Sequence, residues 1–163
     1  MSTHPRATAL IAELGLTAHP EGGWYREVFR SEKQVGTNDD RQQRRALTTI
    51  DFLLSELDFS AWHRVRSDEV WHLLEGGPLR LWLCPPGLGT IQRVDLATVS
   101  EGRAPRLVVP AGWWQAAAPL APFAYCGATV GPGFDFADFS FGRDDADLVA
   151  ALTSLDPQAL RLL

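Results

Sequence analysis

The feature that most constrains the fold is a series of short β-type segments with turn residues between them. Seven such segments, each four to eight residues long, follow one another along the chain: 59–65, 69–74, 79–84, 91–95, 106–109, 113–117 and 123–130. Gly and Pro residues punctuate the series, as in Gly76-Gly77-Pro78. A regular succession of short strands separated by such turns is typical of an all-β sandwich or barrel. We therefore predict a mainly β fold.

Helical patterns flank this series on both sides. Leu10, Ile11 and Leu14 have helical spacing, which predicts a short N-terminal helix at about 6–15. Near the other end, Asp144 and Asp145 can cap a helix at about 144–153. The expected order is therefore helix, β core, helix.

The 163 residues show no internal repeat and no linker-like tract, so we expect one domain spanning 1–163. The barrel core is expected at about 19–141, with two further strands at 24–30 and 46–54. Between those two strands, residues 31–45 are polar and are expected to form the longest loop, with its basic group at 41–45 solvated.

Composition excludes several classes of partner. A formal charge of −5 with scattered basic residues argues against nucleic-acid binding. No apolar run is long enough to span a membrane, and the first residues lack the pattern of a secretory signal. Cys84 and Cys126 lie in apolar strand patterns and not in a C-x-x-C pair, so we expect free thiols and a reduced, cytoplasmic compartment.

Two strand–turn–strand segments carry the most functional information. In the first, His63 is followed by Glu69 and then by Gly76; in the second, Pro110 is followed by Gly112. The spacing resembles the paired motifs of the cupin superfamily, H-x-H-x(3,4)-E-x(6)-G and P-x-G-x-x-H. Two of the four usual metal ligands of that pattern are replaced, by Val65 and by Gln115.

Three longer motifs make the resemblance closer. The segments H-P-E-G-G-W-Y-R-E at 19–27, H-R-V-R-S-D-E-V-W at 63–71 and G-P-G-F-D-F-A-D-F at 131–139 are similar to those of the Cupin_5 subfamily, and the resemblance extends over about 9–152. It implies a double-stranded β-helix, a jelly-roll-like barrel generally found as a homodimer. Members of this subfamily are often described as sugar-epimerase-like from fold alone, which does not establish an activity.

Strand alternation places candidate site residues on one face, because residues two apart share a side of the sheet. His63 and Glu69 are the candidate catalytic residues. Trp71, Trp113, Gln115, Tyr25, Tyr125 and Arg26 are the candidate ligand-binding residues. Together they would make an apolar, aromatic pocket with a few convergent polar groups, as is usual for small-molecule sites.

A resident metal cofactor is not expected. A catalytic transition-metal site needs at least three protein ligands, and only His63 and Glu69 remain. The Gln115 amide is a weak, neutral donor, so His63, Glu69 and Gln115 could at most hold a divalent ion weakly.

Three functions stay open. In the first, an isomerase or epimerase acts on a small polar or sugar-like carbonyl compound: Glu69 orients His63 as the general base, and Tyr25 or Tyr125 is the partner acid. In the second, a non-catalytic cupin binds a small molecule, and the His63–Glu69 pair is structural. The third, a metal-dependent oxygenase or hydrolase, is disfavoured by the two replaced ligands.

Overall fold

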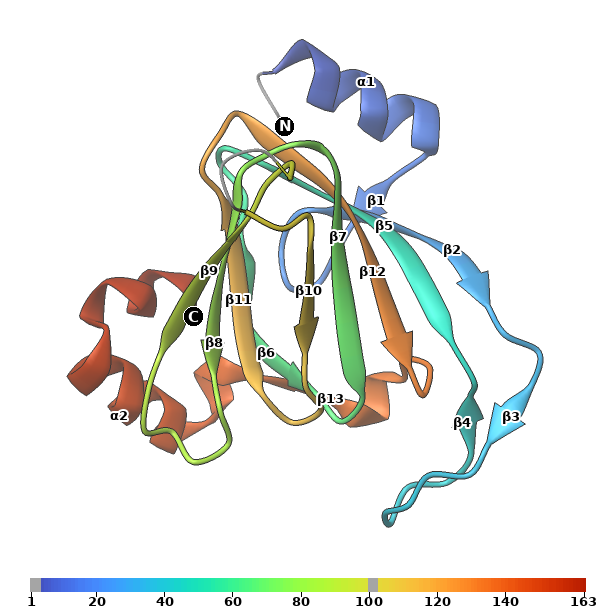
Figure 1. Ribbon diagram of the computed structural model, residues 1–163, viewed down its shortest axis with the longest axis vertical. Coiled ribbons are helices and arrows are strands. Elements are labelled where there is room, and N and C mark those ends of the chain that lie inside the picture. The colour runs from blue at the N-terminus through green and yellow to red at the C-terminus, as the bar shows by residue number, and fades with distance from the viewer. Residues whose placement is uncertain (1–3, 100–102) are drawn as a thin grey trace.

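The computed structural model describes residues 4–99 and 103–163, and two facing β-sheets form its core (Figure 1). The larger sheet has the order β1-β2-β5-β12-β7-β10, and the smaller has the order β13-β6-β11-β8-β9. The strands of the larger sheet are β1 (Thr17–Ala18), β2 (Trp24–Arg30), β5 (Thr48–Ser55), β12 (Phe123–Gly131), β7 (Asp68–Gly76) and β10 (Arg106–Val109). Those of the smaller sheet are β13 (Phe139–Phe141), β6 (Ser60–Val65), β11 (Trp114–Pro119), β8 (Leu79–Cys84) and β9 (Gln92–Leu96). The predicted mainly β architecture is confirmed.

The main core lies between the two sheets. Phe52, Trp71 and Cys126 of the larger sheet meet Leu81 and Leu83 of the smaller sheet, and each is 3% exposed or less. Burial of such side chains contributes roughly 1.5–3 kcal/mol each. The alternating pattern along each strand therefore closes the two sheets on one another.

The helices cover the barrel from outside. Helix α1 (Pro5–Leu14) begins with proline at its first turn and ends at Gly15, whose φ of 64° is left-handed. Helix α2 (Ala146–Leu155) is capped by Asp145, whose side chain accepts a hydrogen bond from the Leu148 N–H. The two predicted flanking helices are confirmed, each within about two residues of the expected bounds.

Both helices bury their apolar sides. Helix α1 packs over the larger sheet, and α2 packs on the outer face of the smaller sheet over three tryptophans (Trp62, Trp82 and Trp114). Among the described residues, the segment 136–163 includes three short 3-10 helices: η2 (Phe136–Asp138), η3 (Gly142–Asp144) and η4 (Pro157–Leu162).

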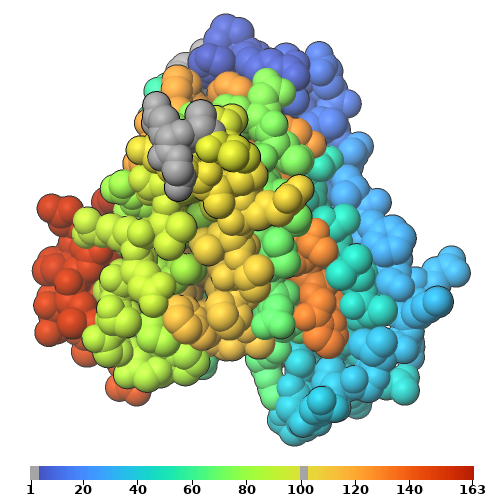
Figure 2. Space-filling view, viewed as in Figure 1, coloured from blue at the N-terminus to red at the C-terminus, as the bar shows by residue number. Residues whose placement is uncertain are grey.

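The polar segment 31–45 differs from the expectation. It holds a two-stranded arm, β3 (Gln34–Val35) and β4 (Arg44–Arg45), that projects beyond the barrel (Figures 1 and 2). The prediction that its basic group is solvated is wrong for two arginines. Arg41 and Arg44 are 6% and 12% exposed, and both donate hydrogen bonds to the Asp138 carboxylate. A distant acid, which local sequence does not reveal, fixes the arm to the barrel.

Within the described residues, no helix is both long and apolar enough to cross a bilayer.

Candidate active site

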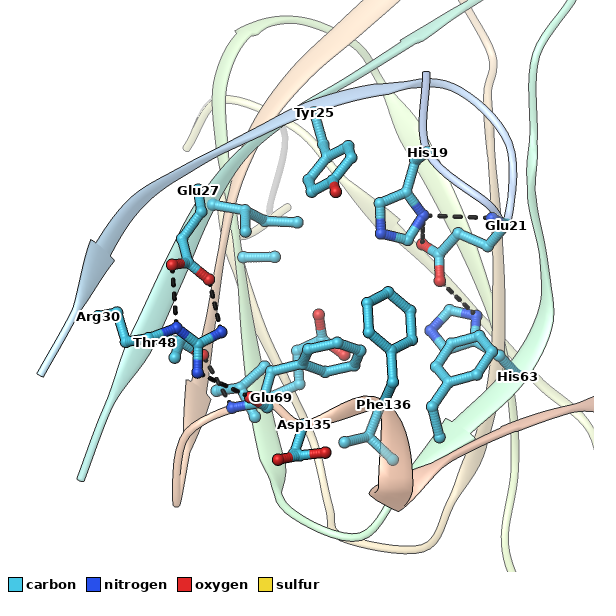
Figure 3. A pocket seen from close by; sticks show the side chains of 16 residues that line it. His19, Glu21, Tyr25, Glu27, Arg30, Thr48, His63, Glu69, Asp135 and Phe136 are labelled. Carbon is cyan, nitrogen blue, oxygen red and sulfur yellow. Dashed lines mark hydrogen bonds and ion pairs between the residues drawn. The ribbon is translucent and has the colours of Figure 1, made fainter. Parts of the chain in front are cut away.

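A cavity of about 460 Å³ lies between the two sheets (Figure 3). Strands β2, β5, β7 and β12 of the larger sheet line it on one side, and strand β6 of the smaller sheet lines it on the other. Its apolar wall consists of Ile50, Val65, Ala128 and Val130. Four aromatic residues also line it, namely Tyr25, Phe134, Phe136 and Phe139. The shape is that of a small-molecule site: a mostly apolar hollow with a few polar groups.

Strand β2 supplies three polar cavity residues because its pleat is interrupted. Tyr25 and Glu27 face the cavity by simple alternation. The register against β5 then shifts between Glu27 and Phe29, a β-bulge, so Arg30 also faces the cavity. Uninterrupted alternation would place Arg30 on the same face as Arg26, and the bulge separates them.

The turn before β2 brings two further titratable side chains into the cavity, His19 and Glu21. Gly22 and Gly23 have φ values of 108° and 75°, and a Cβ on Gly22 would lie 2.1 Å from the Phe59 carbonyl oxygen. Only glycine permits so close an approach of the turn to its neighbour. The Ala61 N–H donates to the Glu21 carbonyl at 2.8 Å, which ties the turn to β6.

Glu21 and His63 meet in the buried part of the cavity. The Glu21 Oε2 atom lies 3.3 Å from the His63 Nδ1 atom, and the Ser60 hydroxyl donates to Glu21 Oε1 at 2.8 Å. The His63 Nδ1 atom lies 2.7 Å from the Ala61 carbonyl oxygen. Because a carbonyl only accepts, Nδ1 carries the proton, and in the neutral ring Nε2 is the basic nitrogen. The ring of Phe139 stacks on His63 at a centroid distance of 5.3 Å.

Glu69 is held from behind by two buried side chains. Gln115 donates from Nε2 to Glu69 Oε2 at 2.6 Å, and Trp71 donates from Nε1 to Gln115 Oε1 at 2.9 Å. Glu69 is 7% exposed, and Gln115 is 2% exposed. This chain fixes the orientation of the Gln115 amide and of the Glu69 carboxyl.

Burial dominates the electrostatics of the site. It raises the pKa of Glu21 to about 8, against the hydrogen bond from Ser60, and raises the pKa of Glu69 to about 7, against the influence of His63. Burial likewise lowers the pKa of His63, and it lowers the pKa of His19 to about 4. Near neutral pH both imidazoles are therefore uncharged and both carboxyls retain protons in part. The close Glu21–His63 contact joins two largely neutral groups.

The donor set does not fit a transition metal. Val65 offers no ligand atom, and both polar atoms of Gln115 are engaged by Glu69 and Trp71. Over residues 4–99 and 103–163, no cluster of three or more His, Cys, Asp or Glu side chains could hold an ion. Catalytic transition-metal sites use three protein ligands and an open position.

Three of the eight sequence-predicted site residues line the cavity: His63, Glu69 and Tyr25. Trp71 and Gln115 lie one layer behind, where they support Glu69 instead of lining the hollow.

The other three predicted residues lie elsewhere. Trp113 packs against the core between the sheets. Tyr125 donates its hydroxyl hydrogen to Asp51 at 2.9 Å, and Arg26 pairs with Asp51 at 3.1 Å. Both contact Asp51 because the pleat of β12 and β2 turns them away from the side that carries the cavity.

His19 and Glu21 are the residues that sequence reasoning missed. The segment 19–27, which contains both, was interpreted only as one of the motifs that resemble the Cupin_5 subfamily. A signal was present, because a His and a Glu two residues apart beside paired glycines mark a turn that approaches another strand closely.

Fold and site together define a cupin barrel: two facing sheets around a pocket, with His63 and Glu69, which have the spacing of the cupin motif, at its wall. The Cupin_5 family, described as "Cupin superfamily (DUF985)", matches residues 8–142, so the chain belongs to this family. No curated protein sequence matches it.

Solved structures agree. The chain is similar to a hypothetical protein from Leishmania major, with 33% identity, 93% of each chain covered and a TM-score of 0.79. It is also similar to a protein from Shewanella oneidensis, with 30% identity, 96% of each chain covered and a TM-score of 0.77. Oxalate decarboxylase from Bacillus subtilis is 14% identical over 90% of this chain and 36% of its own, with a TM-score of 0.56, which shows a shared fold alone.

Proposed function

We propose that the cavity binds a small polar carbonyl compound and that its buried groups catalyse a metal-independent isomerisation or epimerisation. The observation that carries the proposal is the convergence of two carboxyls and two imidazoles, all at most 8% exposed, on one hollow. Burial shifts the pKa values of the two carboxyls toward neutrality and keeps both imidazoles uncharged, and such perturbed pKa values are typical of acid–base sites.

His63 is the proposed base. Its Nδ1–H is held by the Ala61 carbonyl, which leaves Nε2 to accept a proton from carbon next to the substrate carbonyl. The C–H electron pair then forms an enolate, and the proton resides on Nε2. Burial keeps the pKa of His63 low, so the ring is in its basic form at neutral pH.

Protonated carboxyls and a phenol supply the acid. Glu21 and Glu69, which retain protons near pH 7, can hydrogen-bond the enolate oxygen. The Tyr25 hydroxyl points into the cavity from the opposite strand, where it can return a proton to the other face of the carbon (Figure 3). Glu21, and not Glu69, is the carboxyl that contacts the Nδ1 side of His63.

A non-catalytic ligand-binding cupin is the second candidate. It is favoured by the hydrogen bonds that the buried site residues make within the protein: Glu21 with Ser60, His63 with Ala61, and Glu69 with Gln115. In that case the His63–Glu21 contact would hold the turn at 19–23 against β6, and the cavity would bind without chemistry.

Deuterium exchange separates the two candidates. Ketoses and aldoses incubated with the protein in D₂O should gain deuterium next to the carbonyl, as followed by NMR. His63→Asn should lower that exchange by about 10²–10⁴-fold with little effect on affinity, because a general base acts mainly in the transition state. His72→Asn is the matched control, because His72 lies outside the cavity lining and accepts a hydrogen bond from Arg106.

Absence of exchange across compounds that bind would refute the enzyme proposal and favour the binding one. Equal exchange by wild type and His63→Asn would refute the role of His63.

A further inference from the structure

The charges around the cavity are unbalanced. Its lining includes four carboxyl side chains (Glu21, Glu27, Glu69 and Asp135) but a single guanidinium, that of Arg30. A ligand that enters this hollow therefore meets carboxyl groups, two of which (Glu21 and Glu69) are partly protonated near neutral pH, far more often than it meets a cation.

Arg30, the only cation among the described lining residues, is already engaged. It donates to both oxygens of Glu27, at 3.0 and 2.6 Å, and to the Phe134 carbonyl at 3.2 Å (Figure 3). Such a bidentate pair satisfies the planar fork that would otherwise bind a phosphate or carboxylate. An anionic ligand would have to displace Glu27.

The atoms that remain for a ligand can accept hydrogen bonds, in the case of Glu69 when its carboxyl is ionised. The Oε1 atom of Glu69 has no hydrogen bond to any described residue, although Glu69 is only 7% exposed. The Nε2 atom of His63 is likewise without a partner among the described residues and is an acceptor in the neutral ring. At the rim, Asp135 uses one oxygen to accept from the Ala137 N–H.

Aromatic rings stand beside these acceptors. Phe134, Phe136 and Phe139 contact one another at centroid distances of 5.0, 6.2 and 6.2 Å, and all three line the cavity. The face of an aromatic ring attracts a cation. Carboxyl groups and aromatic rings that line one hollow together suit an ammonium group.

We propose that the ligand of this cavity carries a protonated amine and no phosphate or carboxylate, and that it is an amino-substituted polyhydroxy carbonyl compound such as an amino sugar. The carbonyl part of this assignment rests on the proposed function. The preference for a cation over an anion rests on the lining alone.

Matched ligands test the assignment. Isothermal titration at neutral pH and fixed ionic strength would compare a hexose, the corresponding amino-hexose and the corresponding hexose phosphate. The amino-hexose should bind about tenfold more tightly than the neutral hexose, as expected for one charge-assisted hydrogen bond, and the phosphate should bind most weakly. Tightest binding of the phosphate, or no binding of the amino-hexose at millimolar concentration, would overturn the proposal.

Paired variants locate the effect. Glu27→Gln removes the partner of Arg30, so the preference for the amine over the phosphate should shrink about tenfold. Glu75→Gln is the control, because Glu75 forms a similar bidentate pair with Arg6 outside the cavity lining. An equal effect of the two variants would refute a local origin.

The two proposals can fail separately. Tight amine binding without deuterium exchange would refute catalysis and leave the ligand assignment standing. Exchange on a neutral or phosphorylated sugar with no preference for the amine would refute the ligand assignment and leave the catalytic proposal standing.

Discussion

Replacing Glu21 with glutamine is expected to change how the stability of the protein depends on pH. Burial raises the pKa of Glu21 from 4.5 to about 8, so the folded state holds a proton that the unfolded chain releases. The stability associated with that proton is fully present below pH 4.5 and is lost as the pH rises toward 8. In this window Glu21 should lower the free energy of unfolding by about 1.4 kcal/mol per pH unit.

The two cavity histidines act in the opposite direction. Burial lowers the pKa of His19 and of His63 below the ordinary value of 6.5, so the unfolded chain binds protons that the folded state does not. Their contribution to stability is present above pH 6.5 and is lost as the pH falls. Glu69 acts with Glu21, since burial raises its pKa to about 7. Between pH 4.5 and 6.5 the two carboxyls and the two imidazoles therefore largely cancel.

Glu21→Gln should remove the contribution of one of the two carboxyls. Relative to wild type, its free energy of unfolding should rise with pH by about 1.4 kcal/mol per unit, which is about 3 kcal/mol between pH 4.5 and 6.5. Denaturant titrations followed by tryptophan fluorescence at several pH values measure this difference. Glu32→Gln, the same change at an exposed position, is the control and should leave the profile parallel to wild type.

Parallel profiles of wild type and Glu21→Gln across this window would refute the reasoning. They would mean that Glu21 is already ionised in the folded protein over this pH range.

The remaining predictions concern the support of the site, metal content, assembly and thiols. Gln115→Leu leaves the buried Trp71 N–H and the Glu69 carboxyl without their partner, so denaturant titration should show a loss of about 2–5 kcal/mol; a loss below about 1 kcal/mol would contradict the role of this chain. Elemental analysis of protein purified without chelators should find transition metal well below one equivalent, and a full equivalent would contradict the donor-set argument. Light scattering should show a homodimer, because strand β2 pairs with β1 only over its first two residues and leaves a free edge; a monomer at micromolar concentration would count against it. Denatured protein prepared without reductant should react with two equivalents of a thiol reagent at Cys84 and Cys126, which are both buried and free; no reaction would indicate a disulfide.

Local pattern was sufficient for most elements of this fold. Alternation and turn residues predicted nine of the eleven described strands of the two sheets, because each strand must bury one face and each turn must break the pleat. The short strands β1 and β13 were not predicted. The helices were predicted from spacing and from caps such as Asp145. The motif spacing also predicted that His63 and Glu69 belong to one site, and both line the cavity.

The composition of the site was decided by tertiary structure. The bulge in β2 that turns Arg30 into the cavity depends on the pairing of β2 with β5, so the local sequence does not predict the bulge. Glu21 reaches His63 because two glycines let the turn lie against the Phe59 carbonyl, a contact between residues far apart in the chain.

The same distinction explains the protonation states. A sequence shows which residues can titrate, but the direction of a pKa shift depends on how much water the fold removes and which charges it brings close. The sequence by itself therefore determined a cupin barrel with a histidine and a glutamate at its wall. Only the folded barrel buried these residues beside Glu21 and His19, because desolvation and pairing arise between strands and not along them.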